Sequence, residues 1–246
     1  MTLDWISFDL YSSLIDTTLG LRTYFRRLLQ KKGVPVPPEE IAKVFPKVHN
    51  RMLLASGFRR YRELLNSALE ETLRDCKVSF TPEDGAALAT AMGLWRPYDE
   101  VVIQLPRFQK LAKIAIVANA DTNFTTRSCS YLGIAPNLII TSEDVRSYKP
   151  SGKIFVAALA RMYAPSENVL HVSTEADIDI VPAHKLGFKT AYLRRSATPA
   201  PVKPDPDYDV PSLFALAARI GAPADTRELP PWSTLDDRKL GPDSLH

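Results

Sequence analysis

The fold of this 246-residue chain is decided by the stretch Trp5-Ile6-Ser7-Phe8-Asp9-Leu10-Tyr11-Ser12-Ser13-Leu14-Ile15-Asp16. A short apolar run typical of a buried strand ends at Phe8, and Asp9 follows it directly. In an open α/β sheet, ligands bind outside the carboxyl ends of the strands. A carboxylate at that edge is suited to act as a nucleophile or a metal ligand, although an aspartate there can also simply end the strand in a turn. The stretch therefore predicts an α/β sheet with a candidate site at Asp9.

The second half of the chain alternates helical and strand patterns. Apolar strand segments are expected at 113–118, 138–140, 168–172 and 190–193, and helices at 101–111, 123–132, 152–162, 177–186 and 212–220. Alternation of this kind predicts a parallel sheet with helices on both faces. We therefore expect a doubly wound α/β core formed by residues 1–16 and 97–221.

Between the first strand and this core, the pattern is entirely helical. The apolar spacing predicts four helices in the region 17–96, beginning near Leu21, Glu39, Phe58 and Thr81. We interpret this region as an inserted helical cap that stands above the first strand. Residues 222–246 contain several prolines and few apolar side chains, and are expected to form an extended tail.

Composition excludes several classes of protein. Hydrophobic residues make up 45% of the chain and charged residues 24%, as in ordinary globular proteins, and the net charge of +3 is too small to indicate nucleic acid or an anionic membrane as partner. Cys76 and Cys129 lie too far apart for a paired metal-ligand spacing. With the first strand so close to Met1, no signal peptide is expected, and we predict a cytoplasmic protein.

Three further strand ends or loops carry residues that match one family in order and spacing. Besides Asp9, the matching positions are Ala118-Asn119, Lys149-Pro150 and the segment from Ser173 to Asp179. This pattern resembles the haloacid dehalogenase superfamily over roughly residues 3–193. The resemblance implies a Rossmann-like core with an inserted cap, an aspartate nucleophile at Asp9 and a charge-balancing lysine at Lys149.

Departures from the phosphatase pattern indicate the reaction class. Tyr11 resembles the 2-haloacid dehalogenase branch, whereas phosphatases of the superfamily have an acid at that position. Thr174 stands where the metal-binding aspartate belongs, and Ala118 lacks the usual hydroxyl. A phosphatase needs Mg²⁺ to offset repulsion between the aspartate and a phosphate dianion, and Thr174 removes an anionic ligand for that ion. We therefore predict a metal-independent reaction at carbon, with no metal and no cofactor.

The resemblance assigns expected roles within this site. Asp9 would displace a leaving group from carbon and form an ester, Lys149 would keep Asp9 ionised, and Asp179 or Glu175 would activate the water that hydrolyses the ester. The expected substrate is a small carboxylate with a displaceable group, including a strained ring such as azetidine-2-carboxylate. The residues predicted to contact it, through side chains or backbone N–H groups, are Leu10, Tyr11, Ala118, Asn119, Ser173 and Glu175.

Alternatives remain open from the sequence. Asp9, Glu175 and Asp179 could form a rearranged Mg²⁺ site of a phosphatase, or Asp9 and Lys149 could survive as an ion pair in a binding protein without activity. The acids from Glu175 to Asp179 could merely open a helix, and Asn119-Ala120-Asp121 could cap one. His171, inside a strand, is expected to be a buried residue with a hydrogen-bond partner.

Two further expectations follow from the dehalogenase resemblance. The arginine that contacts the leaving halide in that branch falls near Ala42, and Lys47 or Arg51 is its expected equivalent. The branch also implies a possible homodimer formed through the helical insertion.

Overall fold

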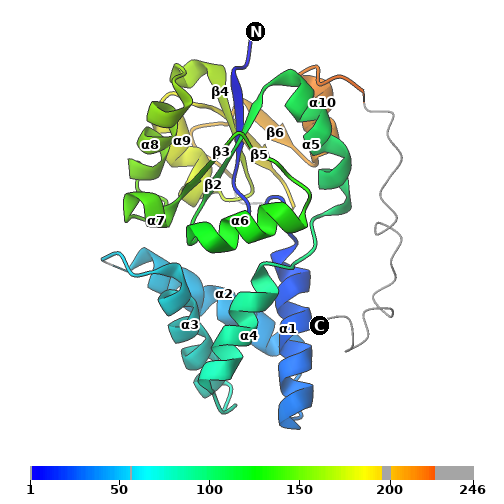
Figure 1. Ribbon diagram of the computed structural model, residues 1–246, viewed down its shortest axis with the longest axis vertical. Helices are drawn as coiled ribbons and strands as arrows, with labels where there is room; N and C mark the ends of the chain where they lie inside the picture. Colours follow the sequence, from blue (N-terminus) through cyan, green and yellow to red (C-terminus); the bar gives the residue numbers. More distant parts are fainter. Residues whose placement is uncertain (1, 56, 196–200, 225–246) are drawn as a thin grey trace.

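A computed structural model describes residues 2–55, 57–195 and 201–224 of the chain. Its centre is a six-stranded sheet in the order β3-β2-β1-β4-β5-β6, with every neighbouring pair parallel (Figure 1). The strands are β1 (Trp5–Phe8), β2 (Lys113–Ala118), β3 (Leu138–Thr141), β4 (Val169–Ser173), β5 (Lys189–Leu193) and β6 (Tyr208–Val210). The predicted doubly wound parallel sheet is thereby confirmed, and β6 adds a strand that the sequence pattern did not indicate.

Helices cover both faces of the sheet because successive strand residues alternate between the faces. Ile6 and Phe8 of β1 belong to the core that includes α5, α6 and α10, whereas Trp5 packs on the opposite face with α8 and α9. These helices are α5 (Asp99–Leu111), α6 (Thr122–Tyr131), α8 (Lys153–Met162), α9 (Val181–Lys185) and α10 (Leu213–Arg219). The short elements α7 (Ser142–Val145) and η1 (Ser166–Asn168) complete this half of the chain.

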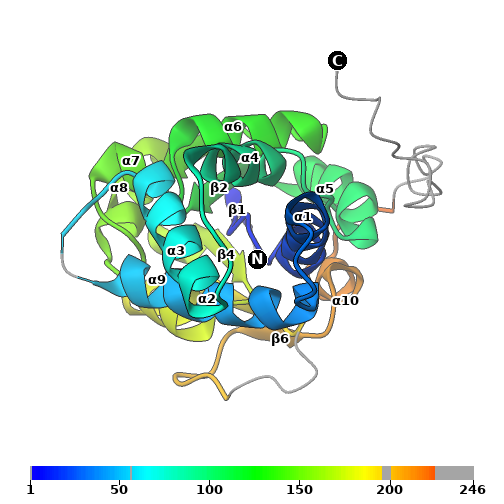
Figure 2. The same ribbon diagram turned by 90° about the horizontal axis from the view of Figure 1, so that it is seen from below.

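Four helices stand at the carboxyl edge of the sheet: α1 (Thr17–Lys32), α2 (Pro38–Leu54), α3 (Tyr61–Asp75) and α4 (Pro82–Met92) (Figure 1). Seen from below, they surround the end of β1 (Figure 2). Helix α1 begins earlier than its apolar spacing predicts because the Asp16 carboxylate accepts a hydrogen bond from Leu19 N, at 2.9 Å. It ends at Gly33, whose φ of 64° suits a residue without a Cβ.

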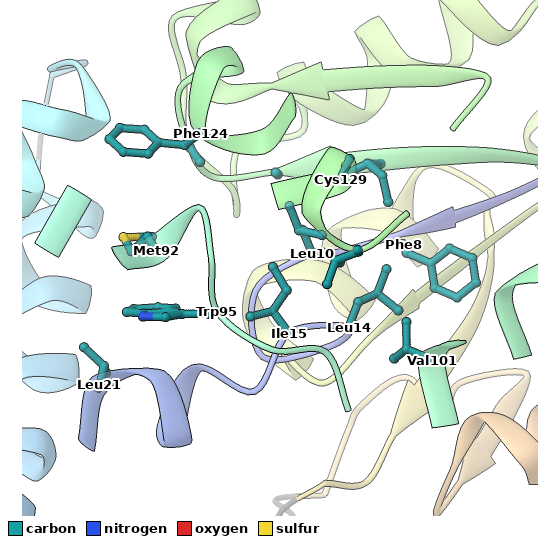
Figure 3. Close-up of a cluster of buried hydrophobic side chains, with 14 of the residues drawn as sticks. Phe8, Leu10, Leu14, Ile15, Leu21, Met92, Trp95, Val101, Phe124 and Cys129 are labelled. Atoms are coloured by element: carbon teal, nitrogen blue, oxygen red, sulfur yellow. The ribbon is translucent and has the colours of Figure 1, made fainter. Parts of the chain in front are cut away.

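The insertion and the sheet share one continuous hydrophobic core. Leu10, Leu14 and Ile15, which follow β1, lie in the same cluster as Met92 and Trp95 at the end of the insertion (Figure 3). Side chains from both parts are therefore buried together, and this packing restricts how the insertion can move relative to the sheet.

Two hydrogen bonds from the insertion to Asp121 of the core add to this packing. Asp121 directly precedes α6, yet its carboxylate accepts hydrogen bonds from Tyr61 N at 2.8 Å and Arg62 N at 3.1 Å, the first amides of α3. The expected helix cap at Asn119-Ala120-Asp121 is thus a cap for a helix of the insertion, because no side-chain hydrogen bond from Asp121 caps its own helix.

The helix predicted at 177–186 begins differently. Residues 176–180 form a π-helical turn, η2 (Ala176–Ile180), in which Ile180 N donates to Glu175 O, and α9 follows it. The expected tail at 222–246 falls mostly outside the described residues. Cys76 and Cys129 are free thiols, and no described helix has the length and hydropathy to cross a bilayer.

Candidate active site

Asp9 lies at the carboxyl end of β1, one of the two central strands of the sheet. Its backbone N–H donates to Val172 O of the neighbouring strand β4 at 3.0 Å, which fixes the residue in line with the sheet. One carboxylate oxygen accepts from Lys149 Nζ at 2.8 Å and the other from Ser13 Oγ at 3.0 Å. Asp9 is 6% exposed, so both oxygens are held by the protein while one side stays open to a cavity.

Lys149 is the hub of the site. Besides Asp9, its ammonium donates to Asp179 Oδ1 at 2.7 Å and to Val117 O at 3.0 Å, so all three N–H groups have acceptors. The Asn119 side chain holds the same loop by accepting from Lys149 N at 2.7 Å and donating to Lys149 O at 3.1 Å. The loop is therefore anchored at its backbone as well as at the ammonium group.

Asp179 joins the site through the π-helical turn. Beside Lys149, its carboxylate accepts from Ser173 Oγ at 3.1 Å and lies 2.9 Å from His171 Nε2. On the far side of the imidazole, His171 Nδ1 lies 2.9 Å from Ser7 Oγ. The prediction that His171 is a buried residue with a hydrogen-bond partner is confirmed, and its partner is a site residue.

Burial dominates the ionisation of this cluster. Burial raises the pKa of Asp9, an effect that the Lys149 ammonium opposes and the Asp179 carboxylate reinforces. For Asp179, the cost of burial is outweighed by the ammonium and by His171, and its pKa is lowered. The pKa of Lys149 is raised despite burial because two carboxylates contact it. Lys149 and Asp179 are therefore held as an ion pair.

A cavity of about 200 Å³ opens between Asp9 and the insertion. Among the predicted site residues, its lining includes the side chains of Asp9, Tyr11, Asn119, Lys149, Glu175 and Asp179. The other three, Leu10, Ala118 and Ser173, are fully buried and do not line it. Leu10 instead packs in the hydrophobic core (Figure 3), and Ser173 donates a hydrogen bond to Asp179.

The prediction that Lys47 or Arg51 takes the place of the dehalogenase arginine in the site is wrong. Lys47 and Arg51 are exposed on α2, where Arg51 pairs with Glu71, and neither lines the cavity. The helical period places other side chains of α2 on the inner face. His49 lines the cavity and lies 3.1 Å from the hydroxyl of Tyr61, which lines it as well.

Two further residues of the site were missed from the sequence. Ser13, beside Asp9, also accepts a hydrogen bond from Thr174 N at 3.1 Å, so it connects the loops after β1 and β4. Ser13 lies four residues after Asp9 and can reach its carboxylate because the turn folds back on itself, with Leu14 N donating to Leu10 O. The spacing alone did not indicate this turn. From the sequence, His171 could be recognised only as a residue inside a strand, and a position inside a strand does not indicate a function.

A magnesium site of the phosphatase type does not fit these residues. Thr174 supplies a hydroxyl where a carboxylate ligand is needed, and Asp9 and Asp179 are already bridged by Lys149. Among the described residues, no group of three or more His, Cys, Asp or Glu side chains is arranged to hold a metal ion. The Tyr11 hydroxyl contacts Ser128 at 3.2 Å, and burial raises its pKa, which makes it a poor proton donor to a leaving alcohol.

The protein thus combines a parallel α/β core, a buried aspartate after the first strand and a helical insertion over that aspartate. A family model described as haloacid dehalogenase-like hydrolase matches residues 3–187. The chain belongs to this family.

Solved structures agree with this fold. An L-2-haloacid dehalogenase from Xanthobacter autotrophicus superposes with a TM-score of 0.78 at 20% identity, covering 89% of this chain and 99% of that one. A defluorinating L-2-haloacid dehalogenase superposes with a TM-score of 0.81 at 18% identity, covering 89% and 96%. At these identities the likeness shows the fold alone.

Curated relatives include two kinds of activity. The (S)-2-haloacid dehalogenase of Pseudomonas fluorescens is 26% identical over 145 residues, or 58% of this chain and 63% of that protein. The ribulose-1,5-bisphosphate 5-phosphatase of Halopiger xanaduensis is 27% identical over 120 residues, or 45% and 50%. The chain spans about half the length of the first curated relatives that it matches.

Proposed function

We propose that this chain is a hydrolase that displaces a leaving group from a carbon atom of a small carboxylate through an ester on Asp9, without an obligatory divalent metal. The observation that carries the proposal is the Lys149 ammonium, which bonds to both Asp9 and Asp179. A fixed cation in this position balances the charge of the nucleophile from within the protein.

The first step forms a bond between an Asp9 oxygen and the substrate carbon as the bond to the leaving group breaks and its electron pair departs with that group. Lys149 donates to Oδ1 and Ser13 donates to Oδ2. These hydrogen bonds fix the plane of the carboxylate, so that its remaining lone pairs face the cavity.

In the second step, water adds to the carbonyl carbon of the Asp9 ester, and collapse of the adduct releases the alcohol and regenerates the carboxylate. Glu175 lines the same cavity, and burial, followed by the nearby charges of Asp9 and Asp179, raises its pKa to about 7. A carboxyl group with this pKa can accept a proton from water near neutral pH. Both oxygens of Asp179 are engaged by Lys149, His171 and Ser173, so we assign the base to Glu175 and a positioning role to Asp179.

Single turnover in heavy-oxygen water tests this proposal. Enzyme in excess over a panel of 2-halo carboxylates, cyclic 2-amino carboxylates and phosphate monoesters would be assayed with and without chelator, and the peptide containing Asp9 analysed by mass spectrometry. We expect turnover that survives chelation, label in the Asp9 carboxylate, and loss of both in Asp9→Asn. Asp177→Asn is the matched control, since Asp177 is exposed two residues from Glu175. Phosphate release that requires Mg²⁺ would contradict the proposal, as would unlabelled Asp9 during turnover.

A further inference from the structure

The cavity has an acidic floor and an apolar wall. The floor is formed by Asp9, Asp179 and Glu175 together with Lys149. The wall comes from the insertion and its junction with the core, and its apolar side chains are those of Leu21, Phe45, Leu53, Leu65, Met92 and Trp95. A ligand that fills this space must match both surfaces.

Charge in the cavity is not balanced. Of the described residues that line it, Lys149 is the only lysine or arginine, and its three N–H groups are already used by Asp9, Asp179 and a backbone carbonyl. His49 adds no positive charge at neutral pH because burial lowers its pKa. Three carboxyl groups therefore face one ammonium that has no donor left for a ligand.

Glu175 is the carboxyl group without a partner. Its backbone N–H donates to Ser173 Oγ at 3.0 Å, but among the described residues none donates a hydrogen bond to its side chain. Burial first, and then the like charges of Asp9 and Asp179, raise the pKa of Glu175 and disfavour its ionised form, which a bound cation would favour. A simple anionic substrate would add to this repulsion, whereas a cationic group beside Glu175 would relieve it.

We propose that Glu175 determines substrate specificity by binding an ammonium group, so that the substrate of this cavity carries an amine and an apolar part that contacts the wall around Trp95. This inference rests on the proposed function for the identity of the site. It narrows the substrate class from carboxylates in general to those that also carry an amine. A zwitterion of this kind has no net charge. Its ammonium contacts one oxygen of Glu175 and keeps that carboxylate ionised, so the second oxygen stays available to accept the proton from water in the second step.

Binding without turnover tests the inference separately from the reaction. Saturation-transfer NMR would compare n-butylammonium with butyrate, two small probes of opposite charge and similar size, on the full-length protein. We expect n-butylammonium to bind more tightly than butyrate, and Glu175→Gln to weaken n-butylammonium about tenfold or more, as expected for loss of a charge-assisted contact in a partly buried site.

Variants keep the outcome interpretable. Glu175→Asp retains the charge and should retain the preference for the ammonium probe, which guards against misfolding of the glutamine variant. Asp177→Asn removes an exposed acid nearby and should change nothing. Equal or tighter binding of butyrate, or unchanged ammonium binding in a folded Glu175→Gln protein, would overturn the inference. Because no turnover is measured, failure of the ester mechanism at Asp9 would leave these results valid.

Discussion

Replacing Lys149 by methionine tests the central feature of the site. The substitution keeps an unbranched side chain of similar length but removes the ammonium that bridges Asp9 and Asp179 at 2.8 and 2.7 Å. It leaves two buried carboxylates facing each other, with Lys149 itself only 1% exposed in the parent. The question is how much free energy of unfolding this change removes.

Because both oxygens contact the same nitrogen, at 2.8 and 2.7 Å, they lie at most about 5.5 Å apart. At that separation two unit charges repel by ~3 kcal/mol at an effective dielectric constant of about 20. Removing one partner of a buried ion pair costs about 3 to 5 kcal/mol for the same reason. The protein can escape part of this cost by sharing a proton between Asp9 and Asp179, which raises the folded-state pKa of the pair above the unfolded value.

The sign of the pH dependence follows from that raised pKa. Near pH 5 the folded variant retains the shared proton and the loss of stability is smaller, whereas near pH 8 both carboxylates are ionised in the folded protein as well as in the unfolded chain, so the folded state carries the full repulsion. Urea denaturation at both pH values should therefore show that Lys149→Met loses about 3 kcal/mol at pH 8 and less at pH 5. The matched control is Lys153→Met, because Lys153 is exposed on the same segment and should lose under about 0.5 kcal/mol at either pH. A loss below about 1 kcal/mol at pH 8, or a loss equal at both pH values, would refute this account of Lys149.

Three other substitutions test the surroundings of the site. Asp121→Ala removes the acceptor for Tyr61 N and Arg62 N. It should lower the free energy of unfolding by about 1 to 2 kcal/mol in urea titrations. An unchanged free energy of unfolding would show that water replaces these two hydrogen bonds. Gly20→Ala places a Cβ 2.4 Å from the Trp95 ring, so a loss of about 1 to 3 kcal/mol is expected by thermal unfolding, and an unchanged Tm would contradict this close packing. Glu175→Gln should stabilise the protein more at pH 8 than at pH 5 in urea denaturation. Burial raises the pKa of Glu175 to about 7, so ionisation of the folded protein opposes folding most strongly at the higher pH. Equal effects at both pH values would disprove the raised pKa.

The sequence predicted the strands and the edge at which they end, because buried parallel strands are short apolar runs bounded by polar residues. Asp9 was placed at that edge by this rule alone, whereas Asn119 after β2 and the acids after β4 were identified by their match to the family pattern. The family resemblance added Lys149, which lies on a loop where no periodicity applies. Side chains that act across the chain were not predictable in this way. The contact of Asp121 with α3 joins residues about 60 positions apart, and nothing local to either segment indicates it.

The π-helical turn explains why sequence spacing alone could not decide which residue after β4 supplies the carboxylate that contacts Lys149. An ungapped comparison with the dehalogenase version of the pattern sets Ile178 at the position of that acid, whereas the usual spacing in the superfamily, five residues after Thr174, sets Asp179 there. In the structure, Ile178 lines the cavity, and Asp179 is the residue whose carboxylate contacts Lys149, Ser173 and His171. A π turn accommodates one more residue than an α-helical turn, so the side chain that points at the lysine shifts by one position. The carboxylate is thus retained in space while its number in the sequence changes, and the hydrogen bond from a buried histidine, which lowers the pKa of Asp179, further favours its ionised form. This is the physical reason for assigning Asp179 to the ion pair with Lys149, and it leaves Glu175, the carboxyl group facing the cavity without a partner, as the group available to a substrate.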